Sequence, residues 1–261
     1  MKNNLKIAVY TCITGDYDTL IKPRHVDERL DYFCFIDNDK QIKLPWILKS
    51  MALPELDNKD KNRYIKMHPH SFFSDYDITI YIDGNVEIVG DLYELAAQIN
   101  ELEGGFFAYA HAERNCVYAE AAACSYFAHD WIWRIAKQMR EYSVNNYPMN
   151  NGLVSANILI RKNNSMLETL MNAWWKAYSS DVKRDQLSLP FVSWQLDIPI
   201  MYLGQNDFRY FQVIKHPIDR KPFKKRVRKY VDRALTFVIP YQKLFSVPFP
   251  ISRKKPFHTI N

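Results

Sequence analysis

A carboxylate and an amide stand two positions apart directly after an apolar run. Residues 78–82 read Ile-Thr-Ile-Tyr-Ile, which predicts a buried strand, and Asp83-Gly84-Asn85 follow it. In open α/β sheets, ligands bind at the carboxyl ends of the strands. Carboxylate and amide oxygens suit a hard divalent cation such as Mn²⁺ or Mg²⁺. The triplet therefore predicts a metal and diphosphate site, although the same residue types also favour a plain turn.

Basic side chains lie shortly upstream of this triplet. Arg63 and Lys66 are three positions apart in a predicted helix over 60–73, so they share a face, and His68 and His70 flank Pro69. Such cations could hold phosphates, but a solvated basic face is the common alternative. A metal-dependent phosphoesterase that uses both histidines is a further alternative, yet the chain offers no further carboxylates in obvious register for two metals.

The elements that must position these residues alternate along the chain. The sequence predicts strands over 6–11, 32–36, 78–82, 106–110 and 154–160, and helices over 60–73, 92–102, 119–142, 165–178 and 183–194. This alternation favours an α/β protein with a mostly parallel sheet flanked by helices. With only 7 glycines, the chain has no phosphate-binding P-loop or dinucleotide fingerprint.

Several motifs occur together in one order. They are residues 10–18 (YTCITGDYD), Arg63-x-x-Lys66-x-x-Pro69-His70, residues 81–85 (YIDGN), His111-x-x-Arg114-x-Cys116-x-Tyr118-x-Glu120, Gly152-Leu153 and residues 184–188 (RDQLS). This combination resembles a family of glycosyltransferase-like proteins of bacteria and plants. The resemblance covers about residues 10–194 and implies the GT-A fold of nucleotide-sugar transferases, a Rossmann-like sheet.

The resemblance implies a donor sugar carried on a nucleotide diphosphate, most often a uridine one. The usual Asp-x-Asp metal motif of that fold falls on Asp83 and Asn85, and the amide in second place implies a weaker or dispensable metal. The segment from Thr11 through Thr14 to Tyr17 is expected to lie against the nucleotide, with Tyr17 or Asp37 at the base or ribose. Arg63, Lys66 and His70 are expected at the donor phosphates.

A looser likeness is to the retaining transferases of the glycogenin and bacterial galactosyltransferase group. It implies Asp185 and Gln186 as catalytic residues beside the sugar. It also implies His216 as a metal ligand and Lys221 as a phosphate-binding lysine, with Phe223 where that group has Trp. The alternative to these roles is that Asp185 caps a helix and His216 is a surface histidine.

Two further side chains are weaker candidates for contacts to donor or acceptor hydroxyls. His111 ends a predicted strand, and Glu120 follows nine positions later at the start of the next predicted helix. A structural histidine with its hydrogen bonds satisfied is an equal alternative for His111.

The basic charge of the chain is concentrated at its end. Residues 214–261 hold 13 Lys and Arg against 2 Asp, whereas the rest is slightly acidic. We therefore expect a catalytic domain over 1–212 and a basic aromatic extension over 213–261. At helical spacing, the extension has a stripe of apolar residues beside cations, which is typical of a helix on an anionic membrane surface. The alternative is that this stripe packs on the domain. The stripe comprises Phe223, Val227, Tyr230, Val231, Ala234 and Leu235.

Together these features predict a metal-dependent glycosyltransferase of the hexosyltransferase type, leaning towards retention. The expected acceptor is a surface polysaccharide, a lipopolysaccharide or a lipid-linked glycan. Four scattered cysteines and a short apolar start favour a cytoplasmic location, peripheral on the inner face of the cell membrane. No nucleic acid partner is expected. The alternative is a basic-tailed module that binds membranes or nucleic acids without catalysis.

Overall fold

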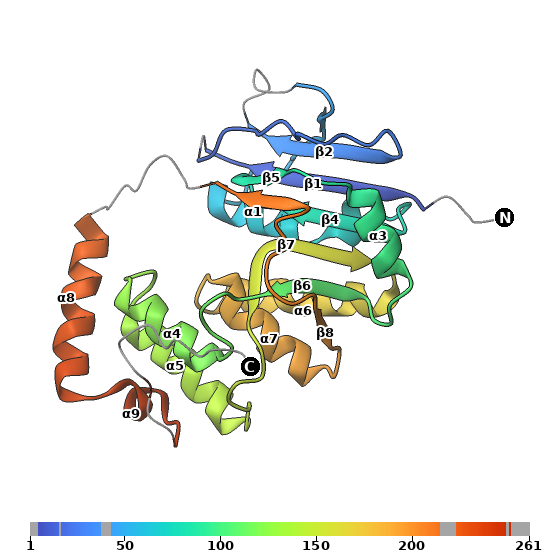
Figure 1. Ribbon diagram of the computed structural model, residues 1–261. Helices are drawn as coiled ribbons and strands as arrows, with labels where there is room; N and C mark the ends of the chain where they lie inside the picture. The colour runs from blue at the N-terminus through green and yellow to red at the C-terminus, as the bar shows by residue number, and fades with distance from the viewer. Residues whose placement is uncertain (1–4, 16, 38–42, 215–222, 249–250, 252–261) are drawn as a thin grey trace. The chain divides into compact units, whose positions relative to one another are not determined.

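The computed structural model describes residues 5–15, 17–37, 43–214, 223–248 and 251. A seven-stranded sheet runs through it in the order β3-β2-β1-β4-β7-β6-β8 (Figure 1). Its strands are β1 (Ile7–Ile13), β2 (Leu30–Ile36), β3 (Ile47–Leu48), β4 (Ile78–Ile82), β6 (Phe106–Ala110), β7 (Val154–Lys162) and β8 (Ile200–Tyr202). β1 pairs in parallel with β2 and β4, and β7 pairs antiparallel with β4. The predicted α/β class with a mostly parallel sheet is confirmed.

The central strands are apolar on both faces. Every residue of β1 and of β4 is buried, which is the pattern of a strand covered by other elements on both sides. A small second sheet pairs β5 (Val86–Ile88) with β9 (Phe211–Val213) in antiparallel fashion. β5 follows the Asp83-Gly84-Asn85 triplet directly, so β9 is brought to the same edge of the sheet.

Helix boundaries in this region follow local rules. The predicted helix over 60–73 is two helices, α1 (Asn58–Met67) and α2 (Pro69–Phe72), because Pro69 fits the first turn of a new helix rather than the interior of one. α3 (Leu92–Asn100) begins, as expected, at the N-cap Asp91, whose carboxylate accepts the Glu94 amide at 2.9 Å.

The chain forms two compact units that alternate along the sequence. The first comprises residues 1–109, 156–175 and 199–218, and the second residues 110–155, 176–198 and 219–261. α6 (Ser165–Ser180) passes from one to the other. The expected boundary between a catalytic domain over 1–212 and an extension over 213–261 stays a prediction.

The second unit is helical. It holds α4 (Val117–Tyr126), α5 (Ile132–Val144), α7 (Asp185–Gln195), α8 (Phe223–Val238) and α9 (Tyr241–Phe245). The single helix predicted over 119–142 is α4 and α5, and Ala128 between them adopts φ 59°. Across the described residues, no helix is both long and apolar enough to span a bilayer.

Candidate functional site

Asp83 stands at the carboxyl end of β4 beside a buried cation. Lys66 Nζ lies 3.6 Å from Asp83 Oδ1, and the Tyr81 hydroxyl donates to the same oxygen at 2.8 Å. The Lys66 side chain is 0% exposed and that of Asp83 is 28% exposed. Burial, and next the charge of Asp83, raise the pKa of Tyr81 well above its ordinary value, so the phenol stays a donor. A fixed positive charge therefore lies behind a carboxylate that solvent reaches.

A buried arginine fixes the backbone of Lys66. Arg161 in β7 donates from Nη1 to the Lys66 carbonyl at 2.7 Å and from Nη2 to the Tyr10 hydroxyl at 2.8 Å. Burial raises the pKa of Tyr10 to about 12, against the opposing effect of Arg161. The sequence analysis missed Arg161, although a cation inside the apolar run of residues 156–161 (ANILIR) is a signal that could have found it.

Arg63 contributes a second positive charge to this edge of the sheet. Its charge lowers the pKa of Tyr81 and of Cys12, although burial makes both pKa values higher than ordinary overall. Asp83 and Asp37 act on Cys12 in the opposite direction. The charges of Arg63, Asp37 and Asp83 thus act on side chains at the carboxyl ends of β1 and β4, and the phosphate role of Arg63 stays a prediction.

The loop after β1 is held in place by two hydrogen bonds at its start. Gly15 has φ 63°, and its amide donates to Asp37 Oδ2 at 2.8 Å. Thr14 Oγ1 donates to the Asn58 carbonyl at the start of α1 at 2.6 Å. Thr11 is buried within β1, whereas the Tyr17 side chain is 67% exposed. Of the residues expected at the nucleotide, Tyr17 presents the most open surface, and its ring suits contact with a base.

The triplet itself is shaped by close packing. A Cβ on Gly84 would lie 2.9 Å from Ile13 Cγ1 and 3.0 Å from Asp18 Cβ, so glycine is needed for space. Asn85 Nδ2 donates to the Ile214 carbonyl at 2.8 Å, and the Ile214 amide donates back to the Asn85 carbonyl at 2.8 Å. Asn85 therefore fastens the end of β9. The predicted residues His216 and Lys221 lie outside the described residues.

The oxygens of this edge fit a hard divalent cation. Asp83 offers a partly exposed carboxylate, and Asn85 is half-buried with its amide nitrogen already engaged, which directs its Oδ1 as the remaining ligand atom. A single negative charge, shared with Lys66, would bind a free ion weakly. Phosphate oxygens from a bound nucleotide would complete such a site.

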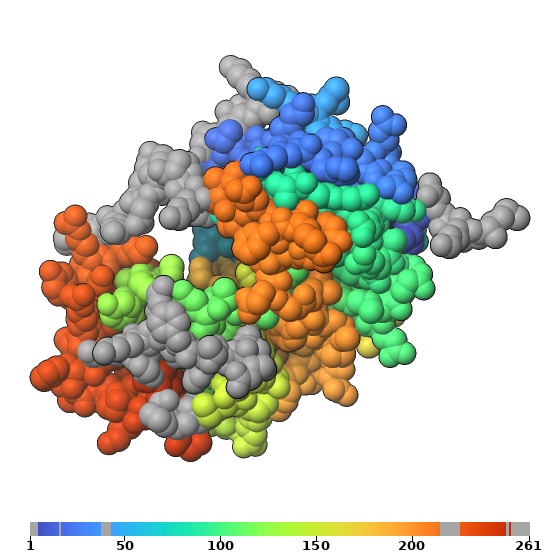
Figure 2. Space-filling view, viewed as in Figure 1, coloured from blue at the N-terminus to red at the C-terminus, as the bar shows by residue number. Residues whose placement is uncertain are grey.

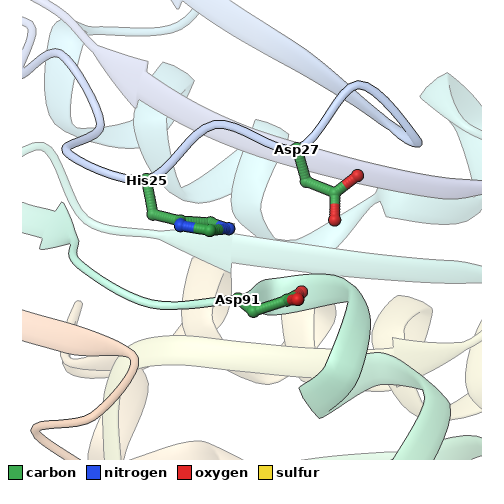
Figure 3. Close-up of side chains that lie close together, drawn as sticks. All are labelled: His25, Asp27 and Asp91. Atoms are coloured by element: carbon green, nitrogen blue, oxygen red, sulfur yellow. The ribbon is translucent and has the colours of Figure 1, made fainter.

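A second group of possible metal ligands has a different use. His25, Asp27 and Asp91 place their ligand atoms within 4.8 Å of one another (Figure 3). However, Arg29 Nε donates to both oxygens of Asp27, at 2.9 and 3.1 Å, and Arg29 lies 3.7 Å from Asp91. A guanidinium that already neutralises these carboxylates makes this cluster a structural fastening of the segment before β2 to the start of α3.

The histidines predicted near the phosphates have other neighbours. His68 Nδ1 lies 2.8 Å from the Tyr64 carbonyl, and its ring stacks on Tyr64 at 3.9 Å. Burial lowers the pKa of His70, and its neighbours include Glu168 and Asn172 of α6 and the His68 ring, whose centroid lies 5.5 Å away. The structure thus shows no contact between His70 and Asp83 among the described residues, and the phosphate role of His70 stays a prediction.

In the second unit, Glu120 is the centre of a buried charge network. Its Oε2 accepts from Arg114 Nε at 2.6 Å, and its Oε1 lies 3.7 Å from Arg184 Nη2 and accepts from Cys124 at 3.4 Å. Two motifs that are far apart in the sequence therefore meet at one carboxylate. Only 3% of Glu120 is exposed, so most of its bonding capacity serves this network.

His111 belongs to the same network through its ring. Its Nδ1 accepts from the amides of Glu113 and Arg114 at 3.1 and 3.2 Å, which places the proton of the neutral ring on Nε2. Burial lowers the pKa of His111, against the raising effect of Glu120, so the neutral ring is favoured. His111 therefore caps the turn after β6, and its contact to acceptor hydroxyls stays a prediction.

Asp185 and Gln186 begin α7 and lie in the same unit as Glu120. The Gln186 amide donates to the Val154 carbonyl at 3.2 Å, and its Oε1 accepts from Arg184 at 3.0 Å. Asp185 is 4% exposed and accepts the Gln186 backbone amide at 3.2 Å. These contacts orient both side chains at the helix start. Their catalytic role beside a sugar stays a prediction.

The fold and the first of these sites define an α/β protein with cations and a carboxylate at the ligand-binding edge of its sheet. The model of the TOD1/MUCI70 glycosyltransferase-like domain family matches residues 35–216, which is more than half of the chain. The chain therefore belongs to this glycosyltransferase-like family, as the motifs indicated. The match includes Lys66, Asp83 and Asp185, whereas the loop of residues 11–17 and α8 lie outside it.

One solved structure that this chain partly matches is that of a bifunctional glycosyltransferase. The apo structure of the WbbM bifunctional glycosyltransferase has a TM-score of 0.46 and 10% sequence identity to this chain. The alignment covers 90% of this chain and 45% of that one, so this chain spans less than half the length of that protein. No curated protein matches the sequence.

Proposed function

We propose that the protein transfers a sugar from a uridine diphosphate donor, with the diphosphate bound between Asp83 and the cations at the carboxyl ends of β1 and β4. The observation that carries this proposal is the buried ammonium of Lys66 at 3.6 Å from Asp83. Membership of the glycosyltransferase-like family supports the reaction class.

The mechanism follows from where charge develops. When the bond from the anomeric carbon to the diphosphate breaks, negative charge grows on the leaving oxygens and positive charge on the sugar ring. Lys66 is already desolvated and fixed through Arg161, so it stabilises the leaving group without reorganising. Arg63 adds a second cation at the same edge. The Tyr81 hydroxyl holds the orientation of the Asp83 carboxylate.

A divalent cation, Mn²⁺ or Mg²⁺, bound by Asp83 and Asn85 would supply further neutralisation of the diphosphate. The loop from Thr14 to Tyr17 is then the surface for the nucleotide, with the exposed Tyr17 ring against the base. Asp37 accepts the Gly15 amide and so holds this loop in position, which would support nucleotide binding without direct contact.

The acceptor and the stereochemistry are proposed on the sequence resemblance. We take the acceptor to be a surface polysaccharide, a lipopolysaccharide or a lipid-linked glycan, and the reaction to be a hexosyl transfer with retention. In this proposal Asp185 or Gln186 faces the sugar. The hydrogen bonds of the Gln186 side chain to Val154 and Arg184 hold it in a fixed position, as a catalytic group needs.

A donor panel tests the proposal. UDP release would be followed with UDP-glucose, UDP-galactose, UDP-N-acetylglucosamine and GDP-mannose, with and without Mn²⁺. We expect turnover of at least one uridine donor by the wild type, and loss of that turnover in Asp83→Asn. Asp75→Asn, which alters an exposed carboxylate in the same unit, is the matched control and should retain activity. Equal turnover by Asp83→Asn and wild type would refute the proposed site.

A further inference from the structure

The helix α8 turns a polar face towards its own unit. Asp232, which is 1% exposed, accepts from the Ser125 hydroxyl at 2.5 Å and from the Tyr241 hydroxyl at 2.6 Å. One turn before it, Arg228 donates to the His129 carbonyl at 3.0 Å. One turn after it, Thr236 is 8% exposed. Residues 228, 232 and 236 are spaced by four, so they lie on one line of the helix, and Arg228 and Asp232 dock this line by hydrogen bonds.

The opposite line of α8 carries cations and aromatic rings in alternation. Arg226, Tyr230, Arg233 and Phe237 follow one another at intervals of four, three and four, which places them on one face. Tyr230 is 72% and Phe237 87% exposed, and both arginines are exposed. The helix is drawn in orange-red, and its atoms lie at the surface in the space-filling view (Figure 2).

The apolar character extends beyond this line towards the end of the helix. Val238 is 75% exposed, Ile239 38% and Leu235 36%. The apolar stripe predicted from the sequence is therefore partly packed on the protein and partly exposed. Val231 packs against the core of the second unit, whereas Tyr230 and Leu235 point to solvent. The described residues therefore do not support the alternative, in which the whole stripe packs on the protein.

We propose that this outward face of α8, with Arg226, Lys229 and Arg233 beside Tyr230, Phe237 and Val238, docks on an anionic phospholipid surface. A monomer gains nothing from exposing a large aromatic ring and a valine on a helix that its own polar face already holds. Arginine and lysine beside those rings complement the negative headgroups, and their aliphatic stems lie along apolar surface. The rings and Val238 enter the boundary between headgroups and acyl chains.

Nucleic acid is the less suitable occupant of this face. Single strands are bound by cations together with aromatic platforms on which bases stack. Tyr230 and Phe237 would meet that requirement, but the exposed Val238, Ile239 and Leu235 stack no base, and they gain free energy when acyl chains replace water around them. The aliphatic part of the surface therefore selects the lipid.

Vesicle sedimentation with matched variants tests the charge contribution. The probes are vesicles of phosphatidylglycerol mixed with phosphatidylcholine, and vesicles of phosphatidylcholine alone. Wild type should bind the anionic vesicles preferentially. Arg226→Gln with Arg233→Gln should bind them about thirtyfold more weakly, at roughly a fivefold loss per charge. Lys137→Gln with Arg140→Gln on the exposed side of α5 removes the same net charge and should bind as the wild type does.

A second pair of variants tests insertion of the rings. Tyr230→Ser with Phe237→Ser should lose the binding that persists when salt screens the charges, whereas Phe208→Ser, at a residue 76% exposed in the first unit, should keep it. Circular dichroism of each variant should match the wild type, since every altered side chain is exposed. Equal losses for α8 and control variants, no vesicle binding by folded wild type, or tight binding of polyuridylate without vesicle binding would each overturn the proposal.

Discussion

The ammonium of Lys66 lies 3.6 Å from the carboxylate of Asp83, yet only the carboxylate is open to solvent. The lysine approaches from the last turn of α1 and the aspartate from the end of β4. An ion pair of this kind orients one partner for the other. In this protein it leaves a positive charge immediately behind a surface that phosphate can reach.

Lys66→Met should weaken binding of uridine diphosphate by about ten- to a hundredfold, because the fixed charge behind Asp83 attracts the phosphates through space by about 1.5–3 kcal/mol at an effective dielectric constant of about 20. The variant fills the same buried volume, and the partly exposed Asp83 can be hydrated, so the free energy of unfolding should change little. Calorimetry of the nucleotide and urea unfolding measure the two quantities. Unchanged affinity in a folded variant would remove Lys66 from the proposed site.

Arg161→Met should lower the free energy of unfolding by about 2 kcal/mol. The Lys66 carbonyl and the Tyr10 hydroxyl would lose a buried charged donor, which costs more than the relieved desolvation of the guanidinium returns. Arg161→Lys keeps one donor and should lose less. Denaturant unfolding of the two variants gives the comparison. A Met variant as stable as the wild type would show that Arg161 is not a fixed support of Lys66.

Much of the first unit could be predicted because its signals are local. The bounds of β4 and the N-cap Asp91 agree with the sequence, since an apolar run and a capping carboxylate act within a few residues. Lys66 and Asp83 could be grouped because α1 leads into β4. Long-range features could not be predicted. They include the antiparallel pairing of β7, the burial of Arg161 and the bond from Asn85 to Ile214.

In the second unit, too, features that depend on long-range contacts could not be predicted. Periodicity identified α8, but the contacts of Asp232 with Ser125 and Tyr241 determine which face is buried, and these depend on α4 and α9. The break between α4 and α5 also escaped prediction, because Ala128 reaches its φ of 59° without a glycine or proline to mark it.

Stability should decrease as the pH falls below about 6.5. Burial lowers the pKa of His68 to about 4, against an ordinary 6.5, so at low pH the unfolded chain takes up a proton that the folded protein excludes. The stabilisation is complete above pH 6.5 and is lost progressively towards pH 4, by about 2–3 kcal/mol. His68→Phe keeps a ring on Tyr64 and should flatten this part of the profile. An identical slope in the variant would assign the effect to other groups.

Asp232→Ala should lower the free energy of unfolding by about 2–4 kcal/mol, because the hydroxyls of Ser125 and Tyr241 would be left buried without their acceptor. Asp232→Asn keeps one acceptor oxygen and should cost about half as much. Amide hydrogen exchange should quicken along α8 in the Asp232→Ala variant. Asp75→Ala, at an exposed position, is the control. A loss of stability in Asp232→Ala no larger than in this control would mean that the polar face does not hold α8.

The most direct test of the central claim is isothermal titration of uridine diphosphate, with and without Mn²⁺, into wild type, Asp83→Asn and the control Asp75→Asn. We predict that the wild type and the control bind uridine diphosphate and that Mn²⁺ strengthens this binding. In Asp83→Asn, Mn²⁺ should no longer strengthen it. Binding of the same strength by all three proteins, or no binding by any of them, would contradict a diphosphate site at the end of β4.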